Sequence, residues 1–159
     1  MKFSEQRGDD MSNYKNVLVA VDLTDEAPEV LERAKQIADS NGATLSVLTV
    51  IRPLTYAYTG LEFAGLAQSM VNFESEAEAS AKERLEVLCN EVGVAAEHRK
   101  IVFGVPAHEI REHADAMGVD LIVVGSHGRH GLGLLLGSTA NGVLHGAHQD
   151  VLTVRIGEA

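Results

Sequence analysis

The stretch LIVVGSHGRHGLGLLLGSTANGVLHGA, from Leu121 to Ala147, decides the fold of this chain. It opens with an apolar, largely β-branched run, Leu121–Val124, that is too short for a helix and is ended by Gly125. Such a run predicts a strand that is buried on both faces. A glycine-rich loop follows, and Ser138-Thr139 then opens an apolar-periodic segment that predicts a helix.

Strand, glycine loop and helix start together predict an anion site. Glycines allow positive φ and close approach of a ligand, and the free N–H groups and dipole of a helix N-terminus favour an anion. Ser138-Thr139 is equally well explained as a helix N-cap, and the two roles can coexist. The loop does not match Gly-x-Gly-x-x-Gly, because Gly125 and Gly128 are three apart, and no Lys follows Gly137 as in a P-loop.

The rest of the chain alternates strand and helix patterns. Further strands are predicted at Asn16–Asp22, Thr44–Val50, Glu97–Phe103 and Asp150–Ile156. Helices are predicted from a cap at Thr24 or Asp25 to about Asn41, with Pro28 in the first turn, from about Gln68 to Val92, and from Pro106 to Gly118.

This alternation predicts an α/β fold, a doubly wound five-stranded parallel sheet with helices on both faces. In such sheets the ligand crevice lies beyond the carboxyl ends of the strands, where the strand order reverses. Asp22 and Gly125 stand at the two most suggestive strand ends.

Composition narrows the class of protein. The chain of 159 residues has a formal charge of −10, which argues against a general nucleic-acid binder. The net negative charge all lies before Gly125, because only Arg129, Arg155, Asp150 and Glu158 are charged after it. No apolar run is long enough to span a membrane, and a single cysteine, Cys89, fits a reducing cytoplasm.

The sequence predicts neither a metal site at its histidines nor a catalytic site. A metal site at His127, His130, His145 and His148 is disfavoured, because zinc sites need convergent ligands and no cysteine or acidic residue is close in sequence. No base with an orienting partner can be assigned for catalysis. Residues 1–13 are polar and aperiodic, which predicts a disordered leader before a domain at residues 14–157.

Five segments in order resemble the universal stress protein family, and the resemblance spans about Asn13 to Ile156. They are VLVAVDLT at Val17–Thr24, LTV at Leu48–Val50, VDLIVVGSHGR at Val119–Arg129, LLGSTAN at Leu135–Asn141 and the closing DVLTVRI. Nucleotide-binding members of the family carry Gly-x2-Gly-x9-Gly-Ser/Thr. Here eight residues rather than nine separate Gly128 from Gly137-Ser138.

The resemblance implies a Rossmann-like fold of the adenine nucleotide alpha hydrolase type, with strand order 3-2-1-4-5, and a nucleotide site. It implies that Asp22 faces the ribose or a metal on the phosphates, that Val50 meets adenine, and that Gly125 lets the ribose approach. It further implies that a second group contacts the phosphates: Gly128, Arg129, Gly137, Ser138 and Thr139.

The resemblance therefore leads to two expectations. The first is a cytoplasmic, non-catalytic stress-response protein that binds ATP or a related adenine nucleotide, with Mg²⁺ on the phosphates, and dimerises through Val151–Ile156 to act on a protein partner. The alternative is a dimeric interaction protein without nucleotide, because Thr55–Leu61 is similar to the A-type branch, some of whose members lack nucleotide binding. A flavin protein of similar topology is a weaker interpretation, because aromatic residues are scarce.

Overall fold

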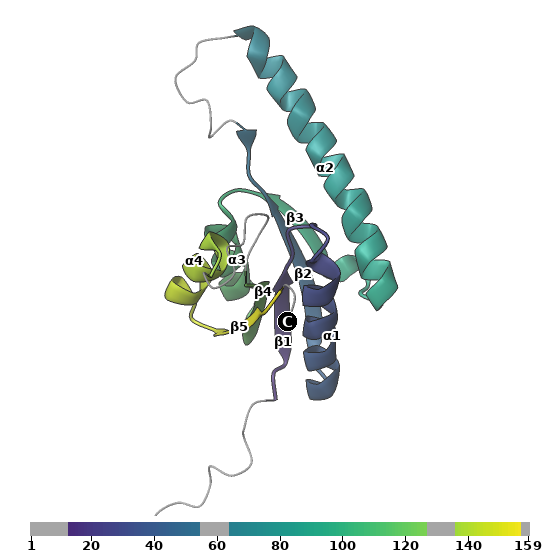
Figure 1. Ribbon diagram of the computed structural model, residues 1–159, viewed down its shortest axis with the longest axis vertical. Helices are drawn as coiled ribbons and strands as arrows, with labels where there is room; N and C mark the ends of the chain where they lie inside the picture. The colour runs from purple at the N-terminus through teal and green to yellow at the C-terminus, as the bar shows by residue number, and fades with distance from the viewer. Residues whose placement is uncertain (1–12, 55–63, 127–135, 157–159) are drawn as a thin grey trace, which may run out of the picture.

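A five-stranded, fully parallel sheet in the order β3-β2-β1-β4-β5 forms the centre of the molecule (Figure 1). The computed structural model describes residues 13–54, 64–126 and 136–156. The strands are β1 (Asn16–Ala20), β2 (Thr44–Ile51), β3 (Arg99–Phe103), β4 (Leu121–Gly125) and β5 (Asp150–Val154). The fold class and the strand order expected from the sequence are therefore confirmed. Residues 1–12 of the predicted leader lie outside the described residues, and so does the whole of Thr55–Leu61.

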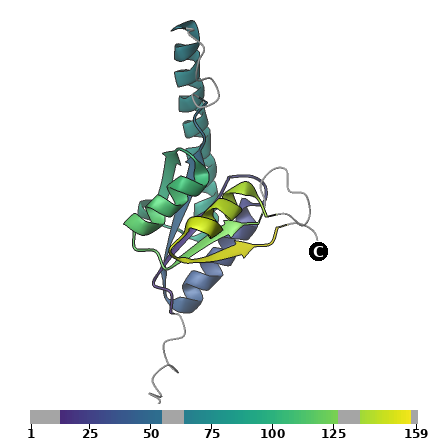
Figure 2. The same cartoon turned by 90° about the vertical axis from the view of Figure 1, so that its left-hand side faces the viewer.

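Within the described residues, four α-helices cover the two faces of the sheet. Figures 1 and 2 show α1 (Ala27–Asn41) and α2 (Ala64–Val92) on one face, and α3 (Pro106–Ala116) and α4 (Ser138–Gly146) on the other. Alternate side chains of a strand point to opposite faces. Accordingly Val17 and Val19 of β1 pack in the core beneath α1 and α2, whereas Leu18 packs in the core beneath α3 and α4.

The strand order reverses at β1. This strand pairs with β2 on one side and with β4 on the other. Its last residue, Ala20, lies opposite Leu48 of β2 and Val124 of β4. The crevice predicted from the sequence therefore lies beyond the carboxyl ends of β1 and β4. Beyond the strand proper, the N–H of Val21 still bonds to the carbonyl of Leu48 at 3.0 Å, and this fixes the direction in which the chain leaves the sheet.

The start of α1 differs from the prediction. Its N-cap residue is Glu26, with no side-chain cap, rather than Thr24 or Asp25. The hydroxyl of Thr24 instead donates to Asp22 at 2.7 Å, and the Thr24 carbonyl accepts from the first helical N–H at 3.0 Å. Pro28 does lie in the first turn, and the helix is followed by Gly42 in the left-handed region, with φ 63°, as its lack of a Cβ allows.

Other boundaries moved by a few residues. The second helix begins at Ala64, before the predicted Gln68. Strand β3 begins at Arg99 rather than Glu97, since Ala96–His98 forms a 3₁₀ turn instead. The described part of the N-terminal half of α2 extends past the sheet (Figure 1), where Val71 and Phe73 are exposed.

Close helix contact holds α4 in place on α3. A Cβ at Gly142 would lie 2.7 Å from the Cβ of Ala107, so the glycine is what allows the two helices to approach. Arg111 of α3 donates to the carbonyl of Gly142 at 2.8 Å, across the same contact. The position of the α4 N-terminus is thus fixed by packing on α3.

Candidate functional site

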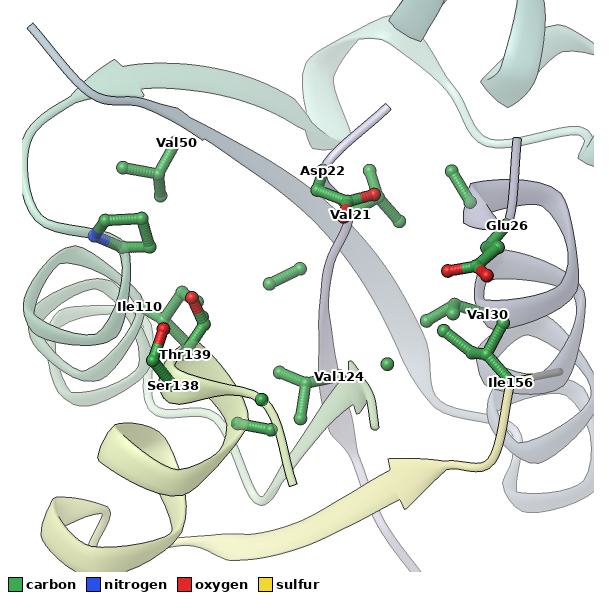
Figure 3. Close-up of a pocket in the computed structure, with 16 residues that line it drawn as sticks. Val21, Asp22, Glu26, Val30, Val50, Ile110, Val124, Ser138, Thr139 and Ile156 are labelled. Atoms are coloured by element: carbon green, nitrogen blue, oxygen red, sulfur yellow. The ribbon is translucent and has the colours of Figure 1, made fainter. Parts of the chain in front are cut away.

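A pocket of about 170 Å³ opens at the reversal point of the sheet. Its walls come from the end of β1, the start of α1, the end of β4 and the starts of α3 and α4 (Figure 3). Six of the eight residues predicted to bind a nucleotide line it: Asp22, Val50, Gly125, Gly137, Ser138 and Thr139. The other two, Gly128 and Arg129, lie outside the described residues, and all eight binding roles remain predictions.

Asp22 stands at the rim between the two sheet faces, just after β1. One carboxylate oxygen, Oδ1, accepts the backbone N–H of Thr24 at 3.1 Å and the Thr24 hydroxyl at 2.7 Å. These two bonds fix the carboxylate in a tight turn, in which Leu23 takes an unusual positive φ of 59°. The second oxygen, Oδ2, carries no hydrogen bond within the described part of the chain. Asp22 can therefore present an anchored carboxylate to a ligand hydroxyl or a cation.

The N-terminus of α4 forms the wall opposite Asp22 (Figure 3). The sequence allowed Ser138-Thr139 to be the N-cap, and this is wrong, because Gly137 occupies the cap position and no side chain caps the helix. The N–H of Gly137 donates to the carbonyl of Ser126 at 2.7 Å. In the first turn, the N–H groups of Ser138 and Thr139 have no helical carbonyl to bond. Both hydroxyls and the positive end of the helix dipole therefore remain available to an anion.

Gly125 has a packing role that the sequence did not reveal. A Cβ at this position would lie 2.5 Å from Cδ1 of Ile156 and 3.3 Å from Cγ2 of Val30. The glycine therefore makes room for the residue that follows β5, and Ile156 becomes part of the pocket wall. The expected close approach of a ribose to Gly125 is a separate prediction that stands beside this one.

Apolar side chains complete the pocket, and most of them were not singled out from the sequence. Three of them lie on the side of α3 and α4, namely Ile110, Val124 and Val50. The other two, Val30 and Ile156, lie on the side of α1. Their sequence signals were those of ordinary core residues, so nothing distinguished them. The pocket is apolar in its depth and polar at its rim, which suits an organic ring attached to charged groups.

Glu26 is the second carboxylate at the pocket and was also missed. It is the N-cap residue of α1, and Figure 3 labels it on the α1 side, beyond Asp22. Hard oxygen donors of this kind suit Mg²⁺, which takes one or two protein carboxylates and completes its shell with phosphate oxygens or water. Among the described residues, however, no group of three or more His, Cys, Asp or Glu side chains converges on a possible metal position.

Comparisons with known proteins agree on one family. The family model described as "Universal stress protein family" matches residues 13–155. Universal stress protein A homolog 1 of Coxiella burnetii is 45% identical over 142 residues, covering 89% of this chain and 96% of the relative. Universal stress protein A homolog 2 of the same organism is 41% identical, covering 92% of this chain and 98% of the relative.

Solved structures show the same architecture. The hypothetical protein MJ0577 is 25% identical with a TM-score of 0.77, and the match covers 93% of this chain and all of that one. A universal stress protein crystallised in complex with cAMP is 25% identical with a TM-score of 0.64, covering 91% of this chain and 98% of that one. Within the described residues of this protein, no helix has both the length and the apolar character that a membrane span requires.

Proposed function

Because this chain belongs to the universal stress protein family, we propose that its pocket binds ATP or a related adenine nucleotide in a regulatory, non-catalytic way. One observation carries the proposal: an anchored carboxylate and an uncapped helix N-terminus face each other across a single hollow at the reversal point of the sheet. The two sides have the opposite electrostatic character that a nucleotide requires, because its sugar hydroxyls donate hydrogen bonds and its phosphates accept them.

Each part of a nucleotide has a chemically matched wall. The adenine ring is assigned to the apolar side beside Val50 and Ile110, and the ribose hydroxyls to Asp22. The phosphates are assigned to the N-terminus of α4, at Ser138 and Thr139. In the other arrangement, Asp22 would face Mg²⁺ on the phosphates instead of the ribose, and the ion would supply charge neutralisation there.

The size of the pocket limits how much of the ligand it encloses. Its volume of about 170 Å³ is below the roughly 300–1,000 Å³ typical of pockets that enclose a whole ligand. We therefore assign it the base, the sugar and the phosphate nearest the sugar. Contacts to the outer phosphates are assigned to Gly128 and Arg129, on the sequence resemblance alone.

The nucleotide would act as a regulator rather than a substrate. The side chains that the described pocket offers for chemistry are two carboxylates and two hydroxyls, and none is paired with a base that could activate it. Bound nucleotide would instead favour one state of a homodimer formed through Val151–Ile156, and so regulate recognition of a partner protein in the cytoplasm. The edge position of β5 supports this arrangement, because no described strand pairs with its outer side and such an edge is available to another chain.

A structural relative supports the ligand class. The universal stress protein solved in complex with cAMP has the same fold over nearly its whole length, and its ligand contains adenine, ribose and one phosphate. Those are the three parts that are assigned above to the walls of the pocket. The experiment should therefore include cAMP and AMP beside ATP and ADP.

Thermal unfolding with millimolar Mg-ATP, ADP, AMP or cAMP tests the proposal. A ligand at 100 times its Kd stabilises the folded state by about 2.7 kcal/mol, which is about 5–10 °C in Tm for a domain of this size. Gly128→Val should abolish the shift by blocking backbone approach. Leu144→Ala, on α4 but outside the pocket, should keep it and serves as the matched control. If none of the four nucleotides changes the Tm of the wild-type protein, the proposal is refuted. That result would favour the alternative, a dimeric interaction protein that binds no nucleotide.

A further inference from the structure

Ser126, the residue after β4, lies at the junction of three elements. Its backbone N–H donates to the carbonyl of Val154, the last residue of β5, at 2.8 Å. Its hydroxyl oxygen accepts the N–H of Ile156 at 3.2 Å, so two successive bonds hold the end of β5. Its carbonyl accepts the N–H of Gly137, the cap residue of α4, at 2.7 Å. One residue thus joins the end of the edge strand to the helix terminus at the pocket.

The same junction shapes two walls of the pocket. Ile156, held by the Ser126 hydroxyl, is a residue only 5% exposed that packs over Gly125 and lines the pocket on the α1 side. Gly137, held by the Ser126 carbonyl, lines it on the α4 side. A displacement of the β5 end therefore changes the pocket in two places, through contacts that are all direct.

We propose that Ser126 is a positioning residue that couples the edge of β5 to the pocket, so that pocket occupancy and the state of the β5 end alter each other's free energy. The coupling must be reciprocal, because it is a property of the joint equilibrium. Its use in nucleotide regulation rests on the proposed function, whereas the mechanical link from Ile156 through Ser126 to Gly137 exists without any ligand.

The link can be tested in the ligand-free protein by amide hydrogen exchange, measured by NMR. Ser126→Ala removes the acceptor of the Ile156 N–H but leaves the carbonyl that accepts from Gly137. If Ser126 couples the two, exchange should accelerate at both amides, by about tenfold, the factor that one lost hydrogen bond can give. Ser126→Thr keeps the hydroxyl and should restore slow exchange at both positions.

Two controls separate coupling from a general loss of stability. Ser40→Ala also removes a serine hydroxyl, which donates to the Gln36 carbonyl at 2.7 Å in α1, and should change neither amide. The Ala147 N–H, bonded to the Val143 carbonyl at the other end of α4, reports on the whole helix and should keep its exchange rate in Ser126→Ala. Faster exchange at Ile156 with no change at Gly137 would overturn the proposal, as would equal acceleration at Ala147.

A second arm adds Mg-ATP and distinguishes this inference from the proposed function. Wild-type protein that binds ATP should show slower exchange at Ile156, and Ser126→Ala should lose that slowing while Ser40→Ala keeps it. If ATP binds but leaves Ile156 unchanged in the wild type, the coupling is refuted while the proposed function stands. If no nucleotide binds, the proposed function fails, and the ligand-free comparison alone decides the role of Ser126.

Discussion

Gly125→Ala is the substitution whose effect can be worked out most closely from the structure. The new Cβ would lie 2.5 Å from Ile156 Cδ1, whereas carbon atoms in contact normally lie about 3.5–4.0 Å apart. Ile156 is almost fully buried, so Cδ1 can relieve this contact only by a change of rotamer toward the pocket that Ile156 lines. Overpacking of this kind costs about 1–3 kcal/mol, of which about 0.4–1 kcal/mol is offset by the lower entropy of unfolded alanine relative to glycine.

The expected net loss of about 0.6–2 kcal/mol corresponds to a fall in Tm of about 1–8 °C. A double-mutant cycle with Ile156→Val identifies the cause, because valine lacks the Cδ1 atom that is in conflict. Ile156→Val alone should cost about 0.5–1.5 kcal/mol. In that background the nearest remaining atoms are Val30 Cγ2 at 3.3 Å and Cγ1 of residue 156 at 3.6 Å, so Gly125→Ala should be nearly neutral.

Chemical denaturation of the four proteins in this cycle gives the coupling energy directly. A coupling of about 1–2 kcal/mol supports the packing role of Gly125. An equal cost of Gly125→Ala in both backgrounds would refute it. So would an unchanged Tm in Gly125→Ala combined with loss of the Mg-ATP shift, since that result would assign the glycine to ligand approach alone.

Three further predictions concern other parts of the fold. Two backbone N–H groups at the start of β1 donate to the Asp120 carboxylate and lower its pKa. The stabilisation from Asp120 is therefore complete above the unfolded pKa of about 3.9 and is lost as pH falls through the lowered folded pKa. Asp120→Asn should accordingly flatten the profile of Tm against pH below about pH 4. Gly142→Ala should destabilise by about 1 kcal/mol in denaturant titration, because its clash with Ala107 outweighs the gain in helix propensity. Asp22→Asn, which keeps an acceptor for Thr24, should leave Tm within a degree or two but reduce the Mg-ATP shift, whereas Asp22→Ala should lose about 1 kcal/mol as well.

The sequence predicted the helices and strands because those depend on local patterns, and the pocket lies at the crevice that was expected from their order. A short, β-branched apolar run such as Leu121–Val124 favours a buried strand. Gly42 marks the end of α1 because glycine readily takes the positive φ that this position requires. The strand order depended on the resemblance to a family, since periodicity does not determine which strands are neighbours. Once the order is known, Asp22 and Gly125 must lie at the same edge of the sheet.

Hydrogen-bond partners were where prediction from sequence failed. A hydroxyl or carboxylate near a helix start can cap the helix or bond elsewhere, and the residues are the same in both cases. Thr24 donates to Asp22 instead of capping α1, and Ser138 follows the cap position instead of occupying it. The two differences have the same consequence, because the N-termini of α1 and α4 both lie beside the pocket without a side-chain cap.

The role of Gly125 was hidden for a different reason, and the reason bears on how the site works. The side chain that requires the glycine belongs to Ile156, far along the chain, and it arrives there because β5 pairs in register with β4, Val154 opposite Gly125. A one-residue shift of that register would remove Ile156 from the pocket wall and Val154 from Ser126. The pocket is therefore completed by the strand that forms the edge of the sheet, and any partner that pairs with this edge acts on a strand whose end is already part of the pocket wall.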